Sequence, residues 1–254
     1  MTGNLRPITP VGLALAALDD GDIDRAVALL RPLDQYLARC TTANSSELAR
    51  LARRSDDHGW NPGDTLEAEM LSGHVEGQLL SILVKLSNAR RVLDVGTFTG
   101  YSALAMAEAL HDENVEGGIV VTCELDDGVA AMAADAFADS VAGNRIRLEV
   151  GPAIDTIARL AHEGEPFDLV FLDADKPGYL PVLQALFEHG LVEPGALIVA
   201  DNTLLQGEPY ADGARSANGD AIAAFNRAVA DDDRVEQVLL PLRDGVSLIR
   251  VRSR

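Results

Sequence analysis

Short apolar runs alternate with helix-like stretches in the second half of the chain, and two of these runs stop at an acid. Residues 169–172 (Leu-Val-Phe-Leu) end at Asp173, and residues 196–200 (Ala-Leu-Ile-Val-Ala) end at Asp201. Runs this short and this apolar are typical of strands buried on both faces of a parallel sheet. The helix-patterned residues between them are long enough for a right-handed crossover. The pattern therefore predicts two neighbouring parallel strands.

Polar residues at the ends of these two strands form a candidate ligand set. Neighbouring parallel strands bring their carboxyl ends to one edge, which is where open α/β sheets bind ligands. We therefore expect Asp173, Asp201 and Asn202 to converge. Two carboxylates and an amide are hard oxygen donors, which suit Mg²⁺ or Ca²⁺.

The rest of residues 91–251 continues the alternation of strands and helices. Helical patterns are predicted at residues 101–110, 127–139, 153–163, 177–189 and 221–229, and further strands at 91–95, 117–124, 145–150, 235–240 and 245–251. This order predicts an α/β fold: a mainly parallel, Rossmann-like sheet of seven strands, the last antiparallel, with helices on both faces.

The N-terminal part of the chain contains short helical patterns and no residues with evident chemistry. Residues 11–18, 23–30, 33–40 and 45–54 are predicted helices, 53–63 a loop, and 64–89 a helix broken near Ser72 and Gly73. We therefore expect an N-terminal helical extension over residues 1–62 and a catalytic domain over residues 63–254. The apolar faces of the extension suggest that it covers an acceptor pocket or builds a dimer interface.

The composition of the chain argues against some classes of function. The chain has 254 residues, 47% of them hydrophobic, and a net charge of −19, which argues against a nucleic-acid partner. No apolar run approaches the roughly 20 residues of a membrane span, and no signal peptide is evident, so a cytoplasmic protein without a membrane partner is expected. Cys40 and Cys123 form no paired motif and are expected to be free thiols. Lysine occurs only at Lys85 and Lys176, the second beside Asp173.

The turn after the first strand favours an adenosine-containing ligand without a pyrophosphate. Gly96 and Gly100 bracket it, but Phe98 occupies the position of the second dinucleotide-fold glycine, where the backbone would approach a pyrophosphate. Asp94 would repel phosphate and attract an ammonium. Glu124, at the end of the second strand, is placed to accept hydrogen bonds from ribose hydroxyls. S-adenosylmethionine (SAM) fits this combination.

Longer motifs resemble those of a known family. The segments VLDVGTFTGYSALAMA, VTCELD, EVGPA, FDLVFLDADKPGY, IVADNTL and LPLRDGVSLIRV occur in this order. The chain resembles the cation-dependent O-methyltransferases, which include caffeoyl-CoA and catechol O-methyltransferases, from about Met70 to Arg252. The first sixty or so residues lie outside the resemblance.

The resemblance implies a role for each matching residue. Asp173, Asp201 and Asn202 would hold the divalent ion, usually Mg²⁺, and Lys176 would be the general base. The residues implied in SAM binding are Asp94, Gly96, Thr97, Ser102 and Glu124, with Ser72, Ala153 and Asp175 contributing. Gln206 falls where family members contact the acceptor. Many plant members carry Trp-Asn where this chain has Leu205-Gln206, and this departure argues against caffeoyl-CoA as the substrate.

The sequence therefore predicts an Mg²⁺-dependent transfer of a methyl group from SAM to a hydroxyl of a small catechol-like acceptor, which could be a secondary-metabolite intermediate. The resemblance also implies a homodimer. Two alternatives remain open at this stage: a non-catalytic SAM-binding protein, and an NAD-dependent oxidoreductase on the same sheet. Phe98 argues against the second alternative.

Overall fold

The computed structural model describes residues 9–60 and 70–253 and divides the chain into two compact units, residues 1–43 and 44–254. The domain boundary expected at residue 62 falls within residues 61–69, which lie outside the described residues. Helix α4 (Ser46–Asp57) belongs to the second unit. The second unit therefore includes a helix that the sequence pattern placed in the extension.

The first unit consists of α1 (Pro10–Asp19), α2 (Ile23–Leu30) and α3 (Leu33–Cys40) in the described part of the chain. Side chains cap two of these helices, because Thr9 Oγ1 accepts a hydrogen bond from Gly12 N and Asp22 Oδ1 accepts one from Arg25 N. Within residues 9–43, the buried centre of the unit is formed by the small side chains of Ala14, Ala17 and Ala26.

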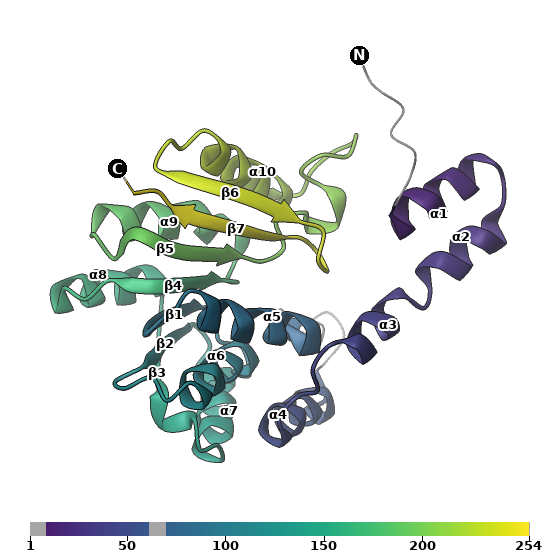
Figure 1. Ribbon diagram of the computed structural model, residues 1–254. Helices are drawn as coiled ribbons and strands as arrows, with labels where there is room; N and C mark the ends of the chain where they lie inside the picture. Colours follow the sequence, from purple (N-terminus) through teal and green to yellow (C-terminus); the bar gives the residue numbers. More distant parts are fainter. Residues whose placement is uncertain (1–8, 61–69, 254) are drawn as a thin grey trace. The chain divides into compact units, whose positions relative to one another are not determined.

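The second unit is built on one seven-stranded sheet in the order β3-β2-β1-β4-β5-β7-β6 (Figure 1). The strands are β1 (Arg91–Val95), β2 (Ile119–Glu124), β3 (Ile146–Val150), β4 (Phe167–Leu172), β5 (Val192–Ala200), β6 (Val235–Leu240) and β7 (Val246–Val251). Strands β1 to β5 pair in parallel, whereas β7 is antiparallel to both β5 and β6. The predicted α/β fold class is confirmed, and β4 and β5 are the neighbours that the apolar runs predict.

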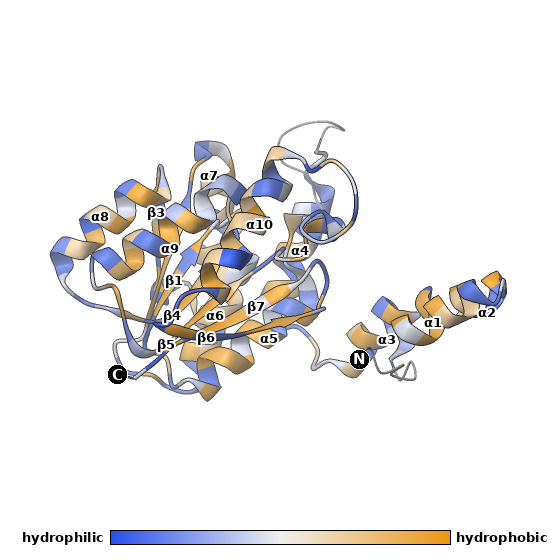
Figure 2. Ribbon diagram, turned by 90° about the horizontal axis from the view of Figure 1, so that it is seen from above, coloured by the Kyte–Doolittle hydropathy of each residue, from blue (hydrophilic) through white to orange (hydrophobic). Residues whose placement is uncertain are grey.

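Helices cover both faces of the sheet (Figures 1 and 2). One layer contains α5 (Gly73–Leu86), α6 (Tyr101–Asp112) and α7 (Asp127–Ala138), with α4 packed on α6; the other contains α8 (Ala153–Glu163), α9 (Tyr179–Glu188) and α10 (Ala217–Ala230). Adjacent strand residues serve opposite layers, since Val92 packs with the first layer and Leu93 with the second. The described residues also include the 3₁₀ turns η2 (Gly143–Arg145), η3 (Lys176–Gly178) and η4 (Leu205–Gly207).

Some boundaries differ from the sequence expectation. Helix α4 continues to Asp57, through the start of the predicted loop, because Leu48, Leu51 and Ser55 bury one side of it. Strand β5 begins at Val192, before the apolar run. The three residues after Val192, Glu193 to Gly195, are exposed and carry no hydrophobic signal, so the pattern missed this part of the strand.

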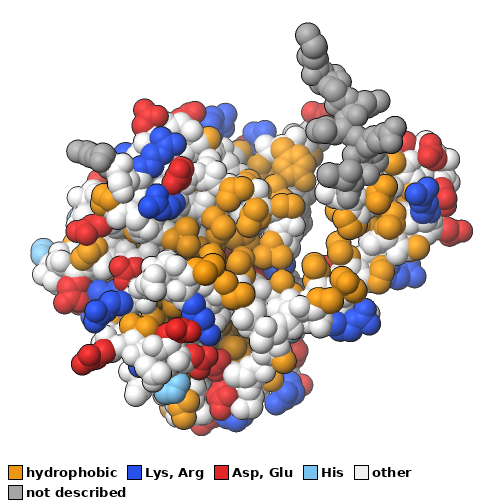
Figure 3. Space-filling model, in the orientation of Figure 1, with side chains coloured by type: hydrophobic (Ala, Val, Ile, Leu, Met, Phe, Trp, Pro, Cys, Tyr) orange, Lys and Arg blue, Asp and Glu red, His pale blue; other side chains and the backbone are white. Residues whose placement is uncertain are grey.

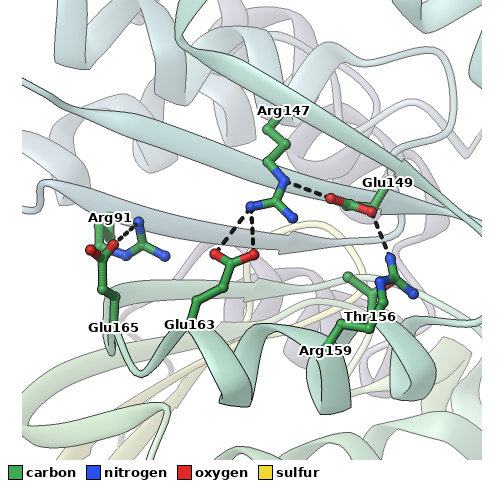
Figure 4. Close-up of polar contacts among 7 residues, drawn as sticks. All are labelled: Arg91, Arg147, Glu149, Thr156, Arg159, Glu163 and Glu165. Carbon is green, nitrogen blue, oxygen red and sulfur yellow. Dashed lines mark hydrogen bonds and ion pairs between the residues drawn. The ribbon is translucent and has the colours of Figure 1, made fainter.

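Ion pairs flank the edge strand β3 (Figure 4). Arg147 lies between Glu149, with Nε and Oε1 2.6 Å apart, and Glu163 of α8, with Nη1 and Oε1 2.8 Å apart. Arg159 of α8 reaches Glu149 as well, at 2.6 Å. Charged side chains at a sheet edge discourage pairing with another chain. Among the described residues, Cys40 and Cys123 are free thiols, and no helix combines the length and apolar character that a membrane span requires.

Candidate active site

The carboxyl ends of β1 and β4 meet closely because residue 96 is glycine. Gly96 has φ +108°, and a Cβ placed there would collide with the carbonyl oxygen of Asp173. Gly96 N and Thr97 N both donate to the Cys123 carbonyl oxygen at 3.1 Å, and Asp173 N donates to Val95 O at 2.8 Å. The turn after β1, the end of β2 and the first candidate metal ligand are thus held together at one edge.

Asp94 lies beneath this turn, with no exposed surface. Its carboxylate accepts hydrogen bonds from Thr122 Oγ1 at 2.6 Å and Ser102 Oγ at 3.1 Å, and Thr97 Oγ1 lies 2.6 Å from Thr122 Oγ1. Burial raises the pKa of Asp94 to about 7, although the hydrogen bonds from Thr122 and Ser102 oppose the rise. The network joins Asp94, Thr97 and Ser102, three of the residues implied in SAM binding.

Glu124 occupies the end of β2 and is held by backbone amides. Its Oε2 accepts a hydrogen bond from Phe98 N at 2.7 Å, and its Oε1 accepts bonds from Leu125 N at 2.9 Å and Asp126 N at 3.0 Å. Phe98 adopts φ +48°, and its ring centroid lies 5.1 Å from that of Trp60. Three donors fix this acid beside the glycine turn, where ribose hydroxyls would meet it.

Lys176 is the centre of the candidate catalytic cluster. Its Nζ donates to Asn202 Oδ1 at 2.6 Å, to the Tyr179 hydroxyl at 2.8 Å and to Asp173 Oδ1 at 3.2 Å. The Tyr179 hydroxyl donates in turn to the Asp201 carbonyl oxygen at 3.1 Å. The structure thus brings Asp173, Asp201 and Asn202 together around one lysine, at the adjoining ends of β4 and β5.

Acidic oxygens next to this cluster lack hydrogen-bond partners. Asp201 Oδ1 and both carboxylate oxygens of Glu76 are buried without one. Burial and the charges of Asp201 and Asp173 raise the pKa of Glu76 to about 9, and burial with the charge of Asp173 raises the pKa of Asp201 to about 6. Arg243 forms an ion pair with Glu76, with Nε 3.6 Å from Oε2.

These orphaned oxygens fit a divalent cation. Buried carboxylates are normally paired or coordinate a metal, and hard oxygen donors select Mg²⁺ or Ca²⁺. Across residues 9–60 and 70–253, no three His, Cys, Asp or Glu side chains are grouped so as to hold a metal ion. The ligand set expected here contains two carboxylates and one asparagine amide. It therefore has only two side chains of those four types and would not count as such a group.

The remaining predicted residues differ in how far each is exposed. Ser72 is buried just before α5, and Ala153 is half-buried at the start of α8. Asp175 is exposed at the start of η3. Gln206 is exposed in η4 with φ +53°, and its backbone N donates to Asp244 Oδ1 at 2.6 Å. A hairpin turn between β6 and β7 thus fixes the loop that carries Gln206.

Sequence reasoning missed Glu76, Tyr179 and Arg243. Tyr179 follows Lys176 by one helical turn, and that spacing was the one available signal of its contact. Arg243 Nη1 donates to Leu71 O at 3.1 Å, across 172 residues, which no local pattern reveals. Glu76 is an isolated acid in a helical pattern, and such an acid is usually assigned to a solvated face.

Comparison with protein families gives an independent identification. The O-methyltransferase family matches residues 46–252, which begins earlier than the resemblance recognised from about Met70. The chain is 30% identical to the O-methyltransferase ankF of Aspergillus thermomutatus, covering 78% of this chain and 86% of ankF. It is 33% identical to caffeoyl-CoA O-methyltransferase 1 of Eucalyptus globulus, covering 76% of each protein.

Solved structures agree with these relatives. The SAH-bound methyltransferase PaMTH1 of Podospora anserina superposes with a TM-score of 0.75 at 26% identity, covering 88% of this chain and 95% of PaMTH1. The O-methyltransferase TomG of Streptomyces achromogenes, in complex with SAM, gives 0.74 at 28% identity, covering 87% and 96%. These likenesses favour neither a nicotinamide oxidoreductase nor a non-catalytic protein. The chain belongs to the O-methyltransferase family, in the cation-dependent group that includes the caffeoyl-CoA enzymes, and it is a SAM-dependent O-methyltransferase.

Proposed function

We propose that this enzyme is Mg²⁺-dependent and methylates a hydroxyl of a small aromatic acceptor with adjacent oxygens. The observation that carries the proposal is the position of Lys176 Nζ, within hydrogen-bond distance of both Asp173 and Asn202. A candidate base, hard oxygen ligands and the turn after β1 therefore share one edge. The acceptor class includes secondary-metabolite intermediates, since TomG is involved in tomaymycin synthesis.

Asp173, Asp201 and Asn202 would hold the cation, which when bound stabilises an acceptor oxyanion and orients it. Lys176 would take the proton of the acceptor hydroxyl on Nζ. This step requires the neutral amine, which a lysine can reach and an arginine cannot. Glu124 and Asp94 would fix the adenosine and charged ends of SAM, whose sulfonium supplies an electrophilic methyl group. Holding donor and acceptor at one edge removes much of the entropic barrier.

Gln206 is proposed to contact the acceptor. It lies on the loop that follows the cation ligands, in which Asn202, Leu205 and Gln206 all have positive φ, at +52°, +36° and +53°. A non-glycine residue at positive φ persists where its surroundings hold it, and such residues gather at functional sites. Here Asp244 supplies part of that restraint, through the bond from Gln206 N. The loop therefore presents a fixed shape to the acceptor.

Methyl transfer from SAM to a panel of catechols and caffeoyl compounds, with Mg²⁺ or with EDTA, tests the proposal. We expect transfer to a catechol in Mg²⁺ and its loss in EDTA. Transfer that survives EDTA would remove the role given to Asp173, Asp201 and Asn202. Transfer restricted to acceptors with a single hydroxyl would overturn the proposed acceptor class.

We also propose that the enzyme is a homodimer. Figure 3 shows hydrophobic side chains gathered over β6, β7 and α5, and the exposed large hydrophobic residues of these elements are Ile82, Leu86, Val238 and Leu239. A contiguous apolar surface of this kind is typical of a protein interface.

Sedimentation should give a dimer, which Val238→Asp weakens. Val141→Asp, at an exposed valine in the turn after α7, is the matched control. A monomeric parent protein would contradict the proposal.

A further inference from the structure

Glu76 is a buried acid for which the ligand set just described gives no role. It lies in the first turn of α5 with no exposed surface, and neither carboxylate oxygen has a hydrogen-bond partner. Asp201, one of the expected cation ligands, is its close neighbour and also keeps one buried oxygen, Oδ1, without a partner. Unpartnered oxygens of two acids thus lie next to each other inside the protein.

The other buried acids at this edge are treated differently. Asp94 receives the hydroxyl hydrogens of Thr122 and Ser102, and Glu124 receives three backbone amides. Burying a charged group without hydrogen bonds carries a large desolvation penalty. The structure satisfies Asp94 and Glu124 in full but leaves Glu76 and Asp201 short of donors. This contrast leaves two ways to complete their surroundings, a proton shared between the two acids or a cation from outside the chain.

The cationic side chains of the site do not complete these surroundings. Arg243 Nε is 3.6 Å from Glu76 Oε2, which is too long for a good hydrogen bond. Arg243 Nη1 donates instead to the Leu71 carbonyl oxygen. Lys176 Nζ donates its hydrogens to Asp173, Asn202 and Tyr179. Neither side chain donates a hydrogen bond to Glu76.

In the described parts of the chain, the carboxylates of Glu76, Asp173 and Asp201 do not form a cluster that could hold a metal ion. We therefore propose that Glu76 is a positioning residue of the cation site, whose negative charge strengthens cation binding from outside the ligand set of Asp173, Asp201 and Asn202. The inference rests on the proposed cation dependence. It adds a fourth residue to the cation site, on a helix that supplies none of the expected ligands.

Cation affinity of the full chain tests the inference directly. After treatment with EDTA and its removal, Mg²⁺ and Mn²⁺ are titrated into the parent protein, Glu76→Gln, Glu76→Asp and the control Glu108→Gln. Glu108 is a half-buried acid on α6 that accepts a bond from Ser45, away from the site. We expect Glu76→Gln to weaken cation binding roughly 10- to 100-fold, the usual effect of losing an outer partner of a metal site. Glu108→Gln should bind as the parent does.

The relative cation affinities of the two Glu76 variants distinguish an effect of charge from an effect of side-chain shape. If the charge acts on the cation, Glu76→Asp binds cations more tightly than Glu76→Gln, although aspartate is shorter. If Glu76 serves only as a neutral hydrogen-bond donor to Asp201, glutamine replaces it well and keeps the parent affinity, which would overturn the inference. The rise in Tm on adding Mg²⁺, compared with the Tm of each variant in EDTA, measures the same difference without depending on basal stability. A parent protein that binds neither cation would overturn the proposed cation dependence itself, an outcome distinct from equal affinities of parent and Glu76→Gln.

Discussion

At the scale of single residues, Lys176 has to satisfy two requirements. An ammonium group has three hydrogens, and Lys176 Nζ lies within hydrogen-bond distance of three acceptors, Asp173, Asn202 and Tyr179. As a base it must also take a proton from the acceptor hydroxyl, which an amine can do and a guanidinium cannot. The cation ligands are thus also the groups that hold the candidate base.

Replacing Lys176 by arginine keeps the charge but prevents proton uptake. We expect Lys176→Arg to lower kcat by about 10²- to 10⁴-fold, the usual contribution of a general base, with SAH affinity unchanged. Lys85→Arg is the matched control, because Lys85 is the other lysine of the chain and pairs at the surface with Asp112, at 3.4 Å. Steady-state methyl transfer measures both variants. A Lys176→Arg enzyme with the parent kcat would exclude proton transfer to this side chain.

Asp94 gives a pH prediction whose sign follows from burial. Its folded-state pKa of about 7 lies above the ordinary aspartate value of 3.8, so the folded protein holds this proton more tightly than the unfolded chain. Stability contributed by the protonated acid is present below about pH 4 and is lost as the pH rises towards 7. Asp94→Asn cannot ionise, so its stability relative to the parent should increase between pH 5 and 8, by at most about 3 kcal/mol.

Denaturant unfolding of Asp94→Asn and the parent at both pH values measures this difference, because subtracting the parent cancels the other titrating groups. Thr122→Val, which removes one donor to Asp94, is a companion variant. It should raise the Asp94 pKa further and steepen the loss of stability with pH. A pH-independent difference between Asp94→Asn and the parent would contradict the assignment.

At the scale of elements, the hairpin turn between β6 and β7 fixes the loop after β5. Thr203 N donates to Gly245 O and Leu204 N to Asp244 O, both at 2.9 Å, and Gln206 N donates to Asp244 Oδ1 at 2.6 Å. The third of these bonds is accepted by the Asp244 side chain, whereas the first two join backbone atoms. The turn therefore links the antiparallel end of the sheet to the proposed acceptor contact.

Asp244→Ala removes that side-chain acceptor. A hydrogen bond to a charged group contributes about 1.5–3 kcal/mol, so we expect KM for the acceptor to rise about tenfold or more, with SAH affinity unchanged. Asp212→Ala, an exposed acid in the loop between η4 and α10, is the control. Initial rates over a range of acceptor concentrations and calorimetry with SAH give the two quantities. Equal losses in acceptor and SAH binding would instead indicate general disorder of the site.

Elements were predictable from the sequence where burial has a regular period. Strand β6 and helix α8 have the predicted bounds, since apolar residues mark both ends of β6 and α8 lies between Pro152 and Gly164. The convergence of Asp173 and Asn202 followed from the rule that parallel strands end at one edge. Glu76 was not predictable, because its burial depends on how α5 packs over the sheet. Arg243 reaches Leu71 from the far end of the chain, and one sequence contains no record of that contact.

At the scale of the whole molecule, the two units differ in how well each buries its own hydrophobic residues. The second unit contains two extensive cores, one on each face of the sheet. In the described part of the first unit, the buried residues are alanines, while Val11, Leu15, Leu18 and Ile23 are 48–63% exposed. A surface of this kind is expected to be covered by another surface. Because every candidate site residue belongs to the second unit, the first unit is not needed to build the site.

Deletion of residues 1–43 separates these roles. We expect the shortened chain to fold and to bind SAH as the parent does, because the turn after β1 and its partners lie within residues 44–254. We also expect it to lose acceptor affinity or dimer stability, because the exposed apolar residues of the extension are expected to cover an acceptor pocket or a dimer interface in the full chain. Calorimetry with SAH, acceptor KM and sedimentation measure the three properties. Leu15→Ser with Ile23→Ser in the full chain is the matched variant, because it removes apolar surface and keeps the length. A shortened chain that remained dimeric with the parent KM would show that the extension has neither role.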